Sequence, residues 1–98
     1  MAFNATNLTN LAGMAPGRSV YRYDTTDALT AVEVTGYINN EDDDQKFAKG
    51  DILWVCVWDT VDTGFPTDFG ILLVNDVDAN GDVGLSTDQL AGTFTSTA

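Results

Sequence analysis

The sequence predicts a small all-β domain, an antiparallel β-sandwich or barrel of about five or six short strands. Short apolar runs alternate with polar residues, as strands with one buried face do. Turn-forming Gly, Asn and Asp residues separate these runs roughly every ten residues. With 98 residues, the chain is long enough for one domain with a single modest core.

The expected organisation has three parts: an extended N-terminal arm at 1–18, a β domain at 19–91 and a flexible C-terminal tail at 92–98. The arm is rich in Asn, Thr, Ala and Gly, a composition that disfavours a helix. We expect it to become ordered by docking elsewhere, with an unstructured terminus as the alternative. Its large apolar residues, the candidate anchors, are Phe3, Leu8, Leu11 and Met14.

Five segments carry the strand pattern: 19–23, 30–38, 52–58, 69–78 and 83–85. The strongest is Ile52–Trp58, in which both alternating sets of side chains are apolar. A strand with two apolar faces is either central in a sheet or covered by a partner. Asn80-Gly81 predicts a type I′ hairpin turn, which requires positive φ at both residues.

An acidic run, Glu41–Asp44, precedes Phe47 and predicts one short helical turn. Asn39 or Asn40 would cap its first amide groups, and the carboxylates would lie at its positive end. We therefore interpret the run as a solvated, capped turn rather than as a cation site.

The residue inventory excludes several classes of function. Fifteen Asp and Glu residues against four Lys and Arg residues give a formal net charge of −11, so neither nucleic acid nor an anionic membrane is an expected partner. The sequence has no His and a single Cys, which excludes Ser-His-Asp and Cys-His catalysis and an intrachain disulfide. Cys56 lies in an apolar segment and is interpreted as a buried, unreactive thiol. Asp51 and Asp59 flank that segment and are interpreted as turn caps, so we expect no enzyme activity and no cofactor.

The segment Asp76–Val83 matches the first part of a calcium-binding loop, with oxygen ligands at alternate positions and glycine at the sixth. The twelfth position is Thr87, where such a loop needs a bidentate glutamate. A hairpin explains Asn80-Gly81 without a metal ion, so we expect none. A calcium-dependent binding module is an alternative, with the ligands Asp76, Asp78, Asn80 and Asp82.

Two tryptophans share one face of the 52–58 segment, which is much aromatic surface for so small a core. Aromatic side chains concentrate both in cores and in subunit interfaces. The candidate core or oligomer-interface residues are Trp54, Trp58, Phe65 and Phe69.

Three short motifs follow one another in the chain: Tyr21-Arg-Tyr-Asp-Thr-Thr-Asp27, Val34-Thr-Gly-Tyr-Ile-Asn39 and Phe47-Ala-Lys-Gly-Asp-Ile-Leu53. Their order and spacing resemble a family of small bacteriophage virion proteins, and the similar region extends from Tyr21 to Leu85. Ile38 and Phe47 stand where that family usually has Phe and Leu, and both exchanges keep apolar character.

The resemblance implies a capsid decoration (cement) protein, which binds the outer surface of the phage head and stabilises it. It further implies a homotrimer at capsid three-fold positions, the major capsid protein as a partner, and a place on the virion after synthesis in the host cytoplasm. The apolar residues of the arm would then contact the capsid. The alternative virion role is a tail or fibre component that binds a host surface.

Overall fold

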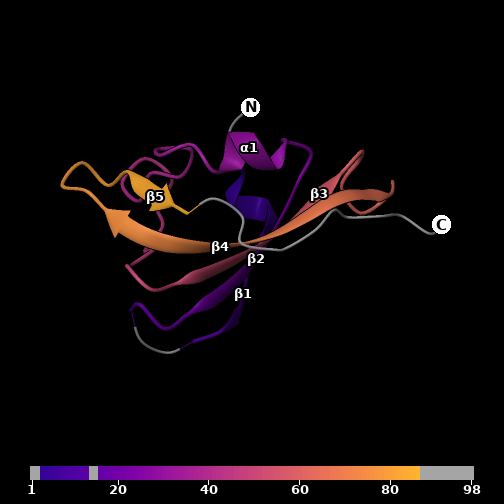
Figure 1. Ribbon diagram of the computed structural model, residues 1–98. Coiled ribbons are helices and arrows are strands. Elements are labelled where there is room, and N and C mark those ends of the chain that lie inside the picture. Colours follow the sequence, from indigo (N-terminus) through magenta and orange to yellow (C-terminus); the bar gives the residue numbers. More distant parts are fainter. Residues whose placement is uncertain (1–2, 14–15, 87–98) are drawn as a thin grey trace.

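The computed structural model describes residues 3–13 and 16–86 of the chain (Figure 1). The all-β class is confirmed, since the described residues form five strands, one 3-10 turn and one helix of four residues. In chain order the elements are η1 (Ala5–Asn7), β1 (Leu8–Ala12), β2 (Val20–Thr25), α1 (Leu29–Val32), β3 (Ile52–Trp58), β4 (Pro66–Val77) and β5 (Val83–Leu85).

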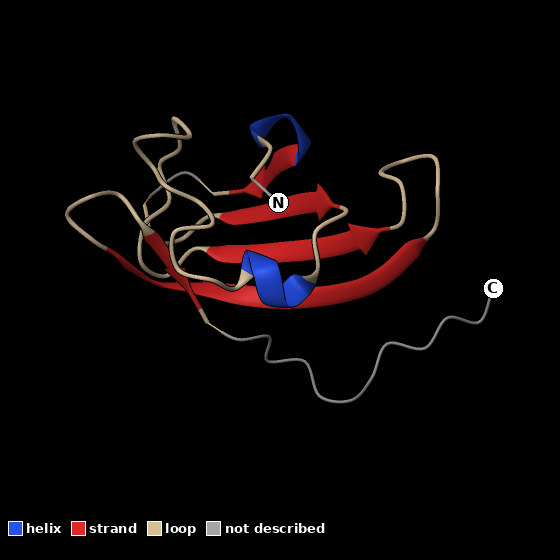
Figure 2. Cartoon of the chain, turned by 90° about the horizontal axis from the view of Figure 1, so that it is seen from above, coloured by secondary structure: helices blue, strands red, loops and turns tan. Residues whose placement is uncertain are grey.

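The strands form one sheet in the order β1-β2-β3-β4-β5. Three neighbouring pairs are antiparallel, but β2 and β3 are parallel. A parallel pair needs a long crossover connection, and residues 26–51 provide it. The helix α1 and its flanking loops lie on one side of the sheet (Figures 1 and 2). The layer that packs on the mixed sheet is therefore this crossover rather than a second sheet.

The predicted strand at 30–38 is wrong, because this segment belongs to the crossover. It contains most of α1, whose buried residues are Leu29 and Val32. A spacing of three places both side chains on one face of a helical turn. Val34, which alternation had paired with Val32, is exposed.

The central strand β3 contributes the middle of the core. Leu53 and Val55 are fully buried, and Val57 is nearly so. From β4, Leu72 and Val74 pack against them, as alternation predicts. The other members of the core cluster are Tyr23, Leu29, Val32, Ile38, Phe47, Val83 and Leu85. The crossover thus closes one face of the sheet with its own apolar side chains.

The strand β4 changes the direction of its side chains near its end. A register shift lies between Val74 and Asp76 in the pairing with β5. As a result Val77 packs against the core cluster, although simple alternation placed it on the same face as Phe69 and Ile71.

Asn80-Gly81 lies in the hairpin between β4 and β5, as predicted, but the turn is not type I′. Gly81 has a φ of 89°, whereas Asn80 is not among the residues with positive φ. The Gly81 N–H donates to the Asp78 carbonyl at 3.0 Å, and the Asp78 N–H donates to the Asp82 carbonyl at 3.1 Å. This pattern is that of a three-residue hairpin loop with a glycine bulge.

The acidic run forms a turn capped by Asn39, and the cap is as predicted. The Asn39 side-chain oxygen accepts the N–H groups of Glu41 and Asp42 at 2.9 and 3.0 Å. Residues 40–44 are a turn rather than a helix. The Asn39 side-chain amide also donates to the Asp82 carboxylate at 2.8 Å, which fixes the turn to the β4–β5 connection.

The described part of the expected arm lies against the domain itself. Its strand β1 is the edge of the sheet and runs antiparallel to β2, with Leu8 opposite Tyr23. The ring of Phe3 stacks on the ring of Tyr23, with 5.1 Å between the ring centroids. In this conformation the extended segment is ordered by its own sheet.

Asp51 at the start of β3 is 1% exposed. Its carboxylate accepts the N–H of Ser19 at 3.1 Å and the N–H of Ala48 at 2.9 Å. Buried amide groups in irregular segments need acceptors. Asp51 provides two of them and thereby joins the loop before β2 to the loop before β3, the turn role expected of it.

Replacement of Asp51 by alanine is expected to lower the free energy of unfolding by about 2–4 kcal/mol, because the buried Ser19 N–H and the partly buried Ala48 N–H lose their acceptor. Asp51→Asn keeps one side-chain oxygen and should cost less. Asp42→Ala, at an exposed acid of the same crossover, is the control and should change this free energy by less than about 0.5 kcal/mol. Urea unfolding followed by tryptophan fluorescence measures all three variants. Wild-type stability in Asp51→Ala would contradict the assigned role.

Candidate interaction surface

The face of the sheet opposite the crossover has no described element packed on it, and we call it the open face. The strand register brings its side chains together, with Trp54 of β3 between Arg22 of β2 and Ile71 of β4. The residues of the open face are Val20, Arg22 and Asp24 of β2, Ile52, Trp54, Cys56 and Trp58 of β3, and Phe69, Ile71 and Leu73 of β4.

The centre of the open face is apolar and accessible. Trp54 is 41% exposed and Leu73 is 44% exposed, while Ile52 and Ile71 are half-buried. Contiguous apolar surface of this kind marks sites of protein interaction. The two apolar faces of β3 therefore have different roles, since one forms the core and the other faces outward.

A compensated charge pair lies at one end of the open face. The Arg22 guanidinium forms an ion pair with Asp24, with 3.0 Å between Nη2 and Oδ1. The Trp58 indole N–H donates to the same carboxylate at 2.9 Å. The hydrogen bond with Asp24 raises the pKa of Arg22. Arg22 and Asp24 therefore neutralise each other, and the Asp62 carboxylate also raises the pKa of Arg22.

Cys56 lies on the open-face side of β3, between Asp24 on β2 and Phe69 on β4. It is buried, as expected, although it lies outside the main core cluster. Burial raises the pKa of its thiol. The thiol is therefore protonated at neutral pH, which makes it a weak nucleophile.

Phe65 is 70% exposed in the connection between β3 and β4. The Asp59 carboxylate closes this loop by accepting the Phe65 N–H at 2.8 Å, which is the turn role expected of Asp59. Trp58 and Phe69, the other aromatic candidates beside Trp54, are half-buried on the open face. Trp54 and Phe65 thus offer the largest exposed fractions of the four.

The four candidate anchors of the arm are not equivalent in the structure. Phe3 and Leu8 pack against the core cluster, and Leu11 is 47% exposed. Met14 lies outside the described residues. Contact of these residues with a capsid stays a prediction, and of the three described side chains Leu11 is the most accessible for it.

A chain of hydrogen bonds joins the crossover to the N-terminal segment. The Tyr37 hydroxyl donates to the Asp27 carboxylate at 2.5 Å and lies 2.9 Å from the Tyr23 hydroxyl. The Asn4 N–H donates to the Tyr23 hydroxyl at 3.0 Å. Burial and the hydrogen bond with Asp27 raise the pKa of Tyr37. Sequence reasoning missed this network, because no local pattern relates residues so far apart in the chain.

The candidate calcium ligands take part in turn hydrogen bonds. The Asp78 carboxylate accepts the N–H groups of Asn80 and Asp82 at 2.9 and 3.0 Å. Asp76 is exposed on β4, opposite Gly84 of β5. Within residues 3–13 and 16–86, no group of three or more His, Cys, Asp or Glu side chains is arranged to hold a metal ion. The hairpin by itself accounts for the polar residues of this loop.

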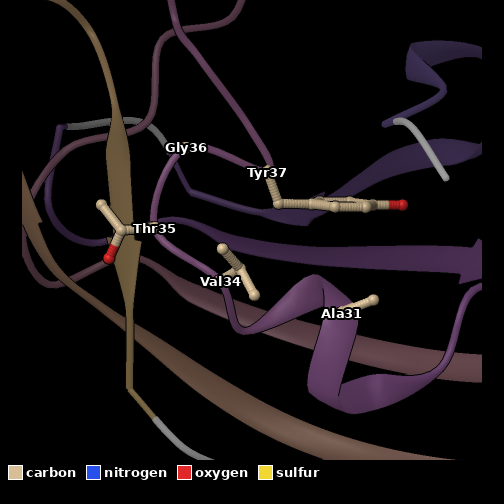
Figure 3. Close-up of a pocket in the computed structure, with 5 residues that line it drawn as sticks. All are labelled: Ala31, Val34, Thr35, Gly36 and Tyr37. Atoms are coloured by element: carbon tan, nitrogen blue, oxygen red, sulfur yellow. The ribbon is translucent and has the colours of Figure 1, made fainter.

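An open hollow with a volume of about 350 Å³ lies beside the end of α1. Its lining residues are Ala31, Val34, Thr35, Gly36 and Tyr37 (Figure 3). The hydroxyls of Thr35 and Tyr37 are the polar side-chain groups of this lining, and the Tyr37 ring extends away from Thr35 (Figure 3). Because no carboxylate, thiol or amine belongs to the lining, the hollow offers apolar contact and no paired acid and base.

No protein-family model matches the chain, and neither a curated protein nor a solved structure matches it significantly. In the described part of the chain, no helix has the length and apolar character needed to cross a membrane.

Replacement of Tyr37 by phenylalanine is expected to lower the free energy of unfolding by about 1–2 kcal/mol, because the Asp27 and Tyr23 side chains lose their common partner. The pKa of Tyr37 is raised in the folded state, so the folded protein holds this proton more tightly than the unfolded chain does. Wild-type stability should therefore fall as the pH rises above about 10, and Tyr37→Phe should fall less. Urea unfolding at neutral and alkaline pH measures both effects.

The control for this prediction is Tyr21→Phe, which keeps the ring contact of residue 21 with Phe47. That variant should retain the wild-type dependence on alkaline pH. The same dependence in Tyr37→Phe as in the wild type would contradict the assignment.

Cys56 in the native protein is expected to react with a thiol reagent such as Ellman's at least about 100-fold more slowly than in the urea-unfolded chain, because burial disfavours the thiolate and blocks access. Absorbance at neutral pH follows both reactions. Equal rates in the two states would show that the thiol is accessible.

Proposed function

We propose that the protein is a bacteriophage capsid decoration protein, which binds the outer surface of the head through contacts between proteins. The observation that carries the proposal is the open face, where Trp54, Ile71 and Leu73 form an apolar surface that no described element covers. Such a surface suits burial against other protein subunits rather than chemistry on a small molecule. The particular role, that of a capsid decoration protein, is the one implied by the three motifs that resemble those of phage virion proteins.

The three motifs coincide with the framework of the fold. The first contains Tyr23 and Asp27, and the second contains Tyr37, so both contribute to one hydrogen-bond network. The third contains the buried Asp51 and leads into β3. The residues that carry the resemblance are therefore residues that hold the strands of the sheet in place. The open face is one face of this sheet.

The charge of the protein supports an external position on the head. The net charge is −11, and exposed acids such as Glu41, Asp42 and Asp44 lie on the crossover. Packaged DNA repels a surface of this sign, whereas contact with other proteins remains favourable. The acidic surface is therefore compatible with a position outside a filled head.

Purified protein is expected to cosediment saturably with capsids that were assembled without it, from the phage that encodes it. The paired substitution Trp54→Gln and Leu73→Gln should weaken this binding at least about tenfold, because central apolar contacts dominate interfaces. Val34→Gln is the matched control, since Val34 is exposed on the crossover instead of the open face. It should change the affinity by less than about twofold.

Two results would overturn this proposal. One is the failure of wild-type protein to bind such capsids at any concentration tested. The other is immunogold labelling of virions that marks the tail and not the head, which would favour the tail or fibre role.

A further inference from the structure

The hairpin between β4 and β5 contains the one Asn-Gly pair of the sequence, Asn80-Gly81. Asn side chains are thermolabile, and a following glycine increases this lability, because it has no Cβ to hinder approach to its backbone nitrogen. We propose that Asn80 is a site of spontaneous chemical modification, that the crossover restrains the reaction in the folded protein, and that the product loosens the crossover from the hairpin. The site is independent of the proposed function, since neither residue belongs to the open face.

The reaction needs no reagent other than water. The backbone nitrogen of Gly81 loses its proton and attacks Cγ of Asn80, which closes a five-membered succinimide ring, and the Cγ–Nδ2 bond breaks as the side-chain amide group takes up a proton and leaves as ammonia. Water then opens the ring at one of its two carbonyl carbons. Cleavage of the new N–Cγ bond gives an ordinary aspartate, whereas cleavage of the original peptide bond gives an isoaspartate, whose main chain passes through the side-chain carbons. In both cases one water is consumed and one ammonia is released.

The side chain of Asn80 is available for this reaction. Asn80 is exposed, and within the described part of the chain its side-chain amide takes part in no hydrogen bond. Only its backbone groups are held, since the N–H donates to the Asp78 carboxylate at 2.9 Å and the carbonyl accepts from the Asn39 side-chain amide at 3.1 Å. The reacting carbon is therefore free to rotate toward the Gly81 nitrogen.

The restraint acts on Gly81, which is buried beneath the crossover. Its N–H donates to the Asp78 carbonyl at 3.0 Å, and its carbonyl accepts the Asn40 N–H at 2.7 Å. The crossover lies so close that a Cβ at this glycine would be 3.0 Å from the Asn39 side-chain oxygen. Because the attacking nitrogen must lose its proton and turn toward the Asn80 side chain, these contacts have to break first. In the folded protein the reaction therefore proceeds through transient local opening of this joint.

An isoaspartate at this position changes the joint permanently. It adds one methylene group to the main chain of a short hairpin loop, so the hydrogen bonds on both sides of it lose their spacing. It also adds a negative charge beside the carboxylates of Asp78 and Asp82, the second of which accepts from the Asn39 amide at 2.8 Å. The next contact inward is the Val83 N–H, which donates to the Ile38 carbonyl at 3.0 Å, and both of these side chains are fully buried. The modification therefore weakens the attachment of the crossover at the edge of the core.

The test compares the folded full chain with the same chain unfolded in urea, both incubated at mildly alkaline pH and physiological temperature. Digestion with a protease that cleaves before Asp separates residues 78–81, which contain Asn80, from residues 68–75, which contain Asn75. Mass spectrometry should show the exchange of an amino group for a hydroxyl at Asn80, at least about tenfold more slowly in the folded than in the unfolded chain. Asn75, which precedes Asp76, is the internal control and should stay unmodified over the same time. An ordinary aspartate at position 80 adds a cleavage site for this protease, whereas an isoaspartate does not.

Variants separate the restraint from the site. Asn39→Ala removes the side chain that holds the Asn80 carbonyl and should speed the modification of the folded protein at least about fivefold, because one hydrogen bond fewer opposes opening. Asp42→Ala, at an exposed acid of the same turn, is the matched control and should stay within about twofold of the wild-type rate. Circular dichroism confirms that each variant is folded. If Asn39→Ala is not, the wild type in urea below its unfolding transition replaces it, and its rate should rise at least about threefold.

The product is tested by its stability. Ion exchange isolates the modified chains by their added negative charge, and their urea midpoint should lie at least about 0.5 M below that of the wild type. Asn80→Asp carries the same charge on an ordinary main chain and should lower the midpoint by less. An unmodified Asn80 in the unfolded chain, equal rates in the folded and unfolded chains, the wild-type rate in a folded Asn39→Ala variant, or an unchanged midpoint of the modified chains would each overturn the proposal.

Discussion

The packing of β3 is the constraint on which the rest of the structure depends. This strand pairs with β2 on one side and with β4 on the other, and its inward side chains Leu53 and Val55 are fully buried. A central strand with apolar residues on both faces needs apolar partners on both. The crossover provides them on one side with residues such as Ile38 and Phe47. The opposite side is the open face, where Trp54 and Leu73 are exposed.

The irregular backbone of the crossover explains why several Asp and Asn side chains form hydrogen bonds with backbone groups. Apart from α1 it has little regular structure, so its backbone N–H groups need acceptors from side chains. Asn39 and Asp51 provide them, and Asn40 exchanges hydrogen bonds with the backbone of Phe47. An acidic composition is therefore compatible with a stable domain, because short oxygen-bearing side chains are suited to capping loops.

Sequence reasoning identified most residues of the candidate surface, but it did not show which face of the sheet would stay uncovered. Alternation in Ile52–Trp58 assigned Trp54 and Val55 to opposite faces of the strand. The hairpin turn at Gly81 was also predicted from the sequence. Which face of β3 would be covered depended on the crossover, whose path no local pattern specifies. The strand predicted across Val34 failed for this reason, since the spacing of apolar residues there suited either a strand or a helical turn.

By itself the sequence determined the all-β class, the central apolar strand, a cap at Asn39 or Asn40 and the lack of any His side chain, because these depend on local pattern and composition. The tertiary structure alone decided the parallel pairing of β2 with β3, the network around Tyr37 and the exposure of Trp54. These features arise from contacts between residues that are distant in the chain. Their energies depend on which segments meet, and short-range periodicity carries no information about that choice.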